Sequence, residues 1–598
     1  MRVLSLLAPT FFGLVACSAP KDGEDTAPAA APPFGMILEE DGQLYAGVAR
    51  IDITPTDFET YSDLNGNHSF DGCITDPTAS RSGCDEPFDD LDGDGRFDGV
   101  WIAGFGSARA ALGVHDPITV TAVVLSLDGE YVALVGIDAL GLLENRIRDT
   151  RDALAAAGFD RDRLIVSSSH SHQGPDTVGI YGIDEDLLTG IYPPFVDNIP
   201  VAIQDAVETA AGTMVAVSPT QGAVRMRDLD PVFNGVPFGG INPDPSVEGG
   251  INDIRDPLIV ADQVLAIALD GADGRVATIV NASGHPEVVG ADNSEISSDY
   301  VGYLRDYTER RSGGLTVFLS GALGGMQSAL GSTLPAIDED GNRVLDETGA
   351  PTWIEDGDGP NWEFARTWGT LVGQAAEAAL TDTTPWTSLR VRTADVLVPV
   401  DNASFKLAFQ VNLLDTPHEY VVQDASCPGY GTNNELFGCV PTGVWTLELG
   451  PVTFGTVPGE LMPELFWGVP DEAAMADASL RTTDRRWVQF DADCAAVPYE
   501  DCKATDGSVG DCDCLKHHAA PYRITDDTGV DTIEAMLPGT YKAPVGIANG
   551  YCGYIVPQPD YNTYVSVLTD DGDHYEETNS CSESFAPLVL EAFASLRE

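Results

Sequence analysis

The sequence predicts an α/β fold built in layers, with a β-rich C-terminal half. Strand-patterned and helix-patterned segments alternate from about residue 118 to 380, the order expected when helices cover a sheet. Beyond about residue 388, β-type runs dominate and cysteine-rich loops separate them. No clear linker divides the halves. We therefore expect one unit over 43–598, with an α/β part at about 43–385 and a β-rich, disulfide-containing part at about 386–598.

The first elements of this order are a hairpin and a helix. The β-branched run Ile118–Leu127 and the apolar run Tyr131–Ile137 flank Asp128-Gly129, a turn typical of two-residue hairpins. Residues 144–157 predict a helix that ends at Gly158. The other predicted elements are strands at 163–168, 264–269, 276–280, 315–319, 389–399 and 444–449, and helices at 201–211, 364–380 and 585–596.

The charge balance excludes whole classes of ligand. The 598 residues include 31 Lys and Arg against 94 Asp and Glu, so the formal net charge is −63. Nucleic acid is excluded because phosphate binding needs a concentrated basic face. Docking on anionic lipid through charge alone is disfavoured for the same reason. With 43% hydrophobic and 21% charged residues, the composition is that of a globular protein.

The N-terminus predicts export. A short charged start precedes the apolar run Val3–Val15, which is too short to span a membrane permanently. Leu14-Val15-Ala16-Cys17 resembles the bacterial lipobox, whose cysteine is lipidated; an ordinary secretory signal is the alternative. We expect a signal peptide over 1–17 and a flexible tether over 18–42. Because no Asp follows Cys17, the anchored protein is expected at the outer membrane of a bacterial envelope; secretion is the alternative.

Cysteine usage fits an oxidising compartment. Without Cys17, ten cysteines remain, enough for up to five disulfides. Neighbours in sequence suggest Cys73–Cys84 and Cys427–Cys439, although spacing does not settle the pairing. Cys512-Asp-Cys514 could instead belong to a metal site, but no CxxC quartet accompanies it, so disulfides are favoured.

Two acidic repeats resemble cation-binding loops. Residues 63–72 and 90–99 place oxygen-bearing side chains at offsets 0, 2, 4 and 8, and 338–346 is a looser third copy. Such glycine-bent loops can bring together the roughly six to eight oxygens that Ca²⁺ takes. None has the Glu that ends an EF-hand loop, and solvated acidic turns are the alternative. The expected calcium ligands are Asp63, Asn65, Asn67, Asp71, Asp90, Asp92, Asp94 and Asp98.

Three of the nine histidines follow strand-like runs. His170 and His172 come after the strand at 163–168, and on an extended segment both would face the same side. His285 follows the strand at 276–280 and precedes Pro286, which disfavours helical backbone. Histidines at strand ends are suited to zinc because the strand holds the ring rigidly. Hydrogen-bonded polar loops are the alternative for each of them.

Eight segments of the chain form an ordered set, namely Tyr45–Pro55, Gly104–Gly106, Gly113–Pro117, Ser169–Pro175, Gly284–Gly302, Pro458–Glu460, Asn549–Tyr554 and Tyr575-Glu576. Taken together, they resemble the neutral (neutral/alkaline, non-lysosomal) ceramidase family. They occur in the order of that family between about residues 44 and 580, with long insertions. No single motif is decisive. The resemblance depends on the occurrence of all the motifs in the order that the family has.

The resemblance implies a zinc site and the residues that assist catalysis there. The family's zinc ligands fall on four residues here, namely His170, His285, Glu460 and Tyr554. The second histidine of the pair, His172, and Tyr575 would assist at the tetrahedral intermediate. The family also has an arginine some fifty residues after the histidine pair. Its nearest match is Arg227, with Arg225 as a neighbour.

The chain departs from the family at two places. The family's GDVSPN segment, whose serine is needed for activity, corresponds to Gly324–Ala329, where Gln327 takes the serine place and Ser328 follows one residue later. We assign the serine role to Ser328, with Gln327 as the alternative. The family's C-terminal immunoglobulin-like domain is expected to be missing, because the chain stops soon after Tyr575.

The implied function is zinc-dependent hydrolysis of an amide. Ceramide, cleaved to sphingosine and fatty acid, is the first expected substrate, and another N-acyl lipid is the second. A binuclear hydrolase with an HxHxDH signature is disfavoured, because Gln173, Gly174 and Pro175 follow His172. A surface lipoprotein that binds without catalysis is the non-enzymatic alternative. The oligomeric state stays open.

Overall fold

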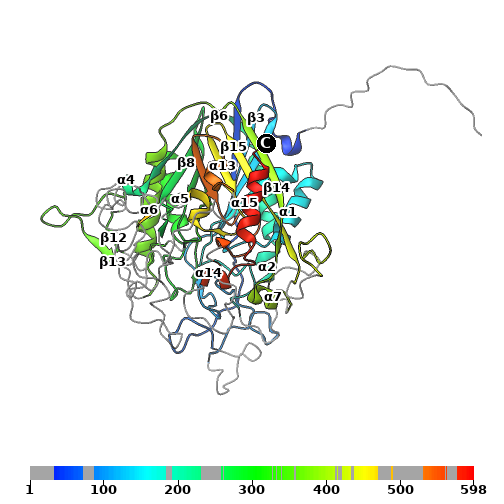
Figure 1. Ribbon diagram of the computed structural model, residues 1–598. Coiled ribbons are helices and arrows are strands. Elements are labelled where there is room, and N and C mark those ends of the chain that lie inside the picture. Colours follow the sequence, from blue (N-terminus) through cyan, green and yellow to red (C-terminus); the bar gives the residue numbers. More distant parts are fainter. Residues whose placement is uncertain are drawn as a thin grey trace, which may run out of the picture.

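A computed structural model describes most of the chain (Figure 1). It covers residues 32–597 except 72–85, 183–190, 230–257, 260, 326–327, 331–332, 339, 356–358, 411–413, 415–420, 432–436, 469–486, 489–529, 559–560 and 562–574. No helix in these ranges is both long and apolar enough to cross a bilayer.

The centre of the fold is an eight-stranded sheet in the order β11-β9-β8-β6-β1-β3-β4-β5. Neighbours are antiparallel except β4 with β5 and β9 with β11, which are parallel. The strands are β1 (Leu44–Asp52), β3 (Thr119–Leu127), β4 (Glu130–Ile137), β5 (Leu164–Ser168), β6 (Val215–Arg225), β8 (Gln263–Gly271), β9 (Gly274–Ala282) and β11 (Leu315–Ser320).

A second sheet packs face to face on the first. It has the order β14-β15-β16-β19, with β14 (Leu389–Pro399), β15 (Cys439–Leu449), β16 (Val452–Thr456) and β19 (Tyr541–Val545). Leu125 and Ile267 of the large sheet share one buried cluster with Leu447 and Phe454 of the small one. Burial of these facing side chains holds the two sheets together.

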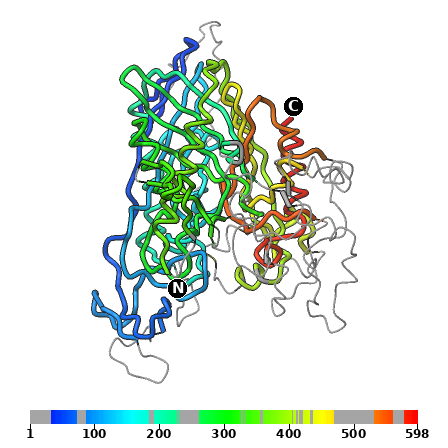
Figure 2. The backbone as a smooth tube through the Cα atoms, turned by 90° about the vertical axis from the view of Figure 1, so that its left-hand side faces the viewer, coloured from blue at the N-terminus to red at the C-terminus, as the bar shows by residue number. Residues whose placement is uncertain are grey.

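Helices cover the outer faces of both sheets (Figures 1 and 2). On the large sheet, successive residues alternate between layers: Val123 faces the small sheet, whereas Val124 packs with the helices. These helices are α1 (Glu144–Ala156), α3 (Ile199–Gly212), α5 (Tyr300–Ser312) and α6 (Trp362–Ala379), and α15 (Phe585–Ser595) covers the small sheet. The layers therefore run helix, sheet, sheet, helix, and the predicted α/β fold with a β-rich C-terminal part is confirmed.

Short elements connect these layers. They are η1 (Pro33–Gly35), β2 (Gly113–Val114), η2 (Arg161–Arg163), α2 (Pro193–Val196), α4 (Met226–Leu229), β7 (Leu258–Ile259), β10 (Glu295–Ile296), β12 (Thr333–Pro335), β13 (Trp353–Glu355), α7 (Ala403–Gln410), β17 (Glu460–Leu461), α8 (Pro463–Trp467), β18 (Trp487–Val488), α13 (Ile533–Met536), β20 (Tyr554–Ile555) and α14 (Tyr575–Thr578).

The predicted hairpin is confirmed by β3 and β4, which pair antiparallel around Asp128-Gly129. Both turn residues have positive φ, +50° and +81°, as a type I′ turn requires. The predicted Cys427–Cys439 disulfide is also present, and a second disulfide joins Cys552 to Cys581. Cys73, Cys84 and the cysteines from 494 to 514 lie outside the described residues.

The expected flexible tether is wrong at its C-terminal end. Met36 is 3% exposed and belongs to the core beneath α1 and α3. Phe34 stacks on Phe159, with ring centroids 6.3 Å apart. The apolar run Phe34–Leu38 thus packs before the first strand begins, because burying it removes hydrocarbon from water.

Candidate metal centre and active site

Three buried histidines gather beyond the end of β5. The ring centroids of His170 lie 4.9 Å from His172 and 5.1 Å from His285, and those of His172 and His285 are 5.7 Å apart. Each residue offers one ring nitrogen within 4.8 Å of the other two. The expectation of extended backbone is wrong for His170, whose φ is +70°. The chain turns at this residue, and the turn brings its ring against the others.

His170 is held by the loop that follows β4. Its backbone N–H donates to Ala139 O at 2.9 Å, and its Nδ1 donates to Leu140 O at 2.7 Å. A carbonyl can only accept, so the ring proton sits on Nδ1. The lone pair is therefore on Nε2, which lies 3.6 Å from Glu460 Oε2.

Glu460 lies beside the histidines. It lies in β17, which pairs in parallel with β20, so that Glu460 is the register partner of Tyr554. Glu460 Oε2 lies 3.1 Å from His285 Nε2, and Oε1 accepts a hydrogen bond from Tyr551 at 2.8 Å. Burial alone would raise the pKa of Glu460, but the neighbouring His170 and the hydrogen bond from His285 lower it to about 2.

The electrostatics favour neutral rings beside an ionised carboxylate. Burial lowers the pKa of His170 to about 4 and that of His172 well below its ordinary value. At neutral pH both imidazoles therefore carry a free lone pair, the form that binds a metal ion.

A cavity of about 210 Å³ lies beside this group. Its polar end includes His170, His172, Glu460, Tyr551 and Tyr554. Its other walls are mostly apolar, with Leu140, Leu143, Val178, Ile180, Phe405, Ala408 and Leu414. A lining that combines candidate metal ligands with apolar side chains suits a ligand with one reactive group and a hydrocarbon part.

A buried arginine supports the histidine pair. Arg109 is 3% exposed, and its Nη2 donates to Ala103 O at 2.6 Å and to His172 O. Nη1 donates to the side chain of Gln173 at 3.3 Å. Burial lowers the pKa of Arg109 to about 9, so it remains a cation at neutral pH. Sequence reasoning missed this residue. A lone arginine within Ala108–Leu112, an otherwise apolar run, was the available signal.

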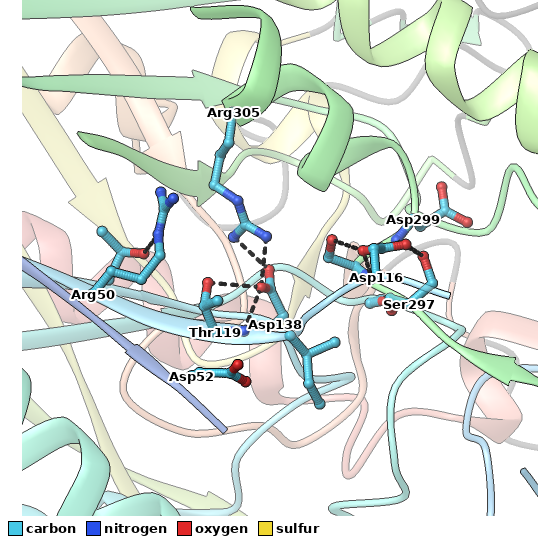
Figure 3. A network of polar contacts seen from close by, with 12 residues as sticks. Arg50, Asp52, Asp116, Thr119, Asp138, Ser297, Asp299 and Arg305 are labelled. Atoms are coloured by element: carbon cyan, nitrogen blue, oxygen red, sulfur yellow. Dashed lines mark hydrogen bonds and ion pairs between the residues drawn. The ribbon is translucent and has the colours of Figure 1, made fainter. Parts of the chain in front are cut away.

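A buried ion pair supports the loop that holds His170 (Figure 3). Asp138 follows β4 directly and receives two hydrogen bonds from Arg305 of α5, at 2.8 and 2.7 Å. The Thr119 N–H donates to the same carboxylate at 2.8 Å. The residues after Asp138 supply the carbonyls that bind His170, so this pair anchors one wall of the site.

A second anchor ties two of the family-like segments together. Asp116 Oδ1 accepts from the N–H of Ser298 at 3.0 Å and from its hydroxyl at 2.6 Å. Figure 3 shows Asp116 beside Ser297. The carbonyl of Ser297 in turn accepts from the hydroxyl of Ser171 at 3.0 Å. Residues of the 113–117 and 284–302 segments thus brace the histidine pair.

The fold matches that of a solved neutral ceramidase from Pseudomonas aeruginosa, with a TM-score of 0.51 at 14% identity over 93% of this chain and 75% of that one. The chain has a ceramidase-like fold. A second solved structure, a ceramidase complexed with C2, gives a TM-score of 0.48 at 13% identity over 93% of this chain and 76% of that one. No protein-family profile and no curated protein matches the sequence. At such identity the likeness concerns the fold alone.

On this ceramidase-like fold the other predicted site residues are more dispersed. Ser328 is 4% exposed, accepts a hydrogen bond from the Leu330 N–H at 3.0 Å and is not among the residues that line the cavity. Arg227 lies in α4 and Tyr575 begins α14, but their side chains lie outside the described part. The C-terminal end of α14 reaches the cavity, because Thr578 and Asn579 line it.

The two acidic repeats lie side by side, and a glutamate before each repeat accepts hydrogen bonds from the backbone of the other. Glu59, four residues before the first loop, accepts from the N–H groups of Leu91 and Asp98 at 2.6 and 2.8 Å. Glu86, four residues before the second loop, accepts in the same way from Leu64 and Asp71, at 2.9 and 2.7 Å. Neither glutamate was a sequence-based candidate. The aromatic core between the loops comprises Tyr61, Phe70, Phe88, Phe97 and Trp101.

The expected calcium ligands fall into different arrangements. Asp92, Asp94 and Asp98 bring carboxylate oxygens within 4.8 Å of one another. In the first loop, Asn65 and Asn67 turn their amide groups to Asp71, at 2.7 and 2.8 Å. In the described part of the third repeat, Asp338, Asp340 and Asp346 do not form a comparable group.

We expect Tyr551→Phe to weaken metal binding about 10- to 100-fold, the usual effect of removing a hydrogen bond to a metal ligand. The substitution keeps the ring and removes only the hydroxyl that donates to Glu460. Titration of metal-free protein with zinc against a competing chelator measures the change. Tyr307→Phe is the control, since its hydroxyl donates to Glu377 on the helical layer. Equal zinc affinity in the two variants would contradict the assigned role of Tyr551.

Proposed function

We propose that this chain is a zinc-dependent hydrolase of lipid-derived N-acyl amines, with ceramide the first candidate substrate. The observation that carries the proposal is the convergence of His170, His285 and Glu460 beside an apolar cavity that Tyr554 also lines. The ceramidase-like fold supports the same reaction class.

The donor set fits zinc. Neutral imidazoles and a carboxylate are ligand types that Zn²⁺ accepts in a four-coordinate site. The phenol oxygen of Tyr554 is an unusual zinc ligand, and it joins the proposed set through the family resemblance. The Nδ1–carbonyl hydrogen bond of His170 is the support that metal-binding histidines commonly have. Bound there, zinc would activate water and polarise an acyl carbonyl.

The protein's own residues supply the remaining functions. The apolar walls, including Val178 and Phe405, would bind the acyl chain and exclude water from the reacting amide. His172 would take a proton during attack and return it to the leaving amine. Tyr575 is proposed to stabilise the developing oxyanion, and Arg227 and Ser328 remain proposed catalytic residues.

The competing proposal is a binding protein without catalysis. It is favoured by the placement of Ser328, which bonds to Leu330 rather than lining the cavity. In either case we propose attachment to the outer membrane by a lipid on Cys17, which would bring the cavity near lipid substrates despite the acidic charge.

An activity screen decides between the two. Zinc-loaded protein is given ceramides and other N-acyl amines, with His285→Ala as the inactive control. The hydrolase proposal expects about one zinc per chain, amine release that a chelator abolishes, and no turnover by the variant. Bound ligand with no release of amine from any substrate would favour the binding protein.

We also propose that the paired acidic loops bind calcium. Removing calcium with EGTA is then expected to lower the melting temperature by a few degrees, because an ion at about 100 times its Kd adds about 2.7 kcal/mol. Asp92→Asn combined with Asp94→Asn should abolish the effect. Asp273→Asn, in an exposed turn between β8 and β9, is the matched control and should retain it. An unchanged melting curve of the native protein after EGTA would reject calcium as a ligand.

A further inference from the structure

The ring of His172 has little freedom to turn. Its backbone N–H donates to Pro286 O at 2.9 Å, and Arg109 donates to its carbonyl. Gly104 lies so close that a Cβ there would come within 2.2 Å of His172 Cγ. The ring of Phe105 meets the imidazole edge to face, with centroids 5.3 Å apart. Packing and backbone contacts together set the direction of both ring nitrogens.

A carboxylate lies on one side of this ring. Glu287 Oε2 lies 3.3 Å from His172 Nδ1, and the two side chains are 17% and 10% exposed. Within the described part of the chain, neither ring nitrogen of His172 makes a hydrogen bond, so Glu287 acts on Nδ1 as a nearby negative charge. Glu287 stands two residues after His285, so one segment beyond β9 carries both a candidate metal ligand and this carboxylate.

We propose that Glu287 is a positioning residue for His172, holding the proton on Nδ1 so that the Nε2 lone pair is available in the cavity. A negative charge 3.3 Å from Nδ1 favours the tautomer that carries the proton on that nitrogen. The arrangement follows the logic of a catalytic triad, in which an acidic group orients the histidine. Its catalytic consequence rests on the proposed amide hydrolysis.

The proton balance of the reaction assigns each group a task. The water oxygen forms a new bond to the acyl carbon, and one water proton passes to His172 Nε2. When the carbon–nitrogen bond breaks, its electron pair stays on nitrogen, which receives that proton. The products are a carboxylic acid and an amine. The Glu287 carboxylate, 3.3 Å from Nδ1, would stabilise the imidazolium between the two transfers.

Two variants and one control test the role through kinetics. Glu287→Ala is expected to lower kcat about 10- to 100-fold while KM, zinc content and the melting temperature stay close to native. Glu287→Gln should recover part of kcat, because its amide oxygen still places a partial negative charge beside Nδ1. Glu295→Ala is the control, because Glu295 faces another histidine, His115 Nδ1 at 3.7 Å, and its side chain is 47% exposed. Native kcat in Glu287→Ala would overturn the proposal.

Imidazole ¹⁵N NMR supplies a readout that does not depend on turnover. The His172 signals, assigned by comparison with His172→Gln, should show the Nδ1–H tautomer in the native protein and lose it in Glu287→Ala. An unchanged tautomer in that variant would overturn the proposal. If the native protein cleaves no N-acyl amine, the proposed function fails, and this spectrum alone decides whether Glu287 orients His172.

Discussion

Replacing His170 by alanine is expected to leave a folded protein that no longer holds zinc. His170 is buried at 3% exposure, and its Nδ1–Leu140 hydrogen bond aims Nε2 at Glu460. Removing a ligand outright should cost more than the roughly 10- to 100-fold typical of outer-shell partners. We therefore expect zinc affinity to fall by more than about 100-fold and hydrolysis of N-acyl amines to fall to background. Metal analysis after dialysis, together with the substrate screen, measures both.

A histidine outside the site provides the control for this experiment. His115 stacks on Trp362, with ring centroids 3.5 Å apart and an interplanar angle of 4°. His115→Ala should keep the native zinc content and activity. If His170→Ala retains about one zinc per chain and turns over substrate, the assigned metal centre is wrong.

Arg305→Met is expected to destabilise the fold by about 3–5 kcal/mol, because it leaves an uncompensated buried charge. The side chains of Arg305 and Asp138 are only 8% and 1% exposed, and the pair is bidentate. Its loss should also loosen the loop that binds His170, so zinc affinity is expected to fall together with stability. Urea unfolding of metal-free protein gives the change in the free energy of unfolding without the contribution of zinc.

The same helix carries a matched control. Arg310 pairs with Asp306 four residues earlier in α5, and these side chains are 57% and 58% exposed. Arg310→Met should change stability by less than about 0.5 kcal/mol, since water already solvates both charges. Equal effects of the two substitutions would show that burial does not determine how much the Arg305–Asp138 pair contributes to stability.

Local patterns predicted much of the fold. The β3–β4 hairpin follows from β-branched runs around Asp128-Gly129, whose positive φ values depend on neighbouring residues only. Helix α1 likewise ends where Gly158 predicts. Helix α5 was missed, because its sequence is strongly charged and its capping residue, Asp299, has an unusual φ of +54°. Packing against α6 and β11 stabilises this helix.

The residues of the candidate site were predictable from the sequence, but the groups that hold them in place were not. His170, His285, Glu460 and Tyr554 stood out through a resemblance of ordered motifs, which periodicity alone would not have shown. The groups that orient them come from distant segments. Nothing in the sequence around Leu140, Arg109 or Glu287 indicates which atom of the site each of them contacts.

The alternation of strands and helices, the acidic loops and the types of side chain available for chemistry were all predictable from the sequence. These depend on residues a few positions apart, so they can be read along the chain. Only the tertiary structure decided that segments near His170, His285 and Glu460 meet at one buried point. It also decided that Arg305 anchors Asp138 from α5. Both results depend on strand order and on the packing of one layer on another. These bring together residues that are far apart in the sequence, so the distance along the chain does not predict their contact.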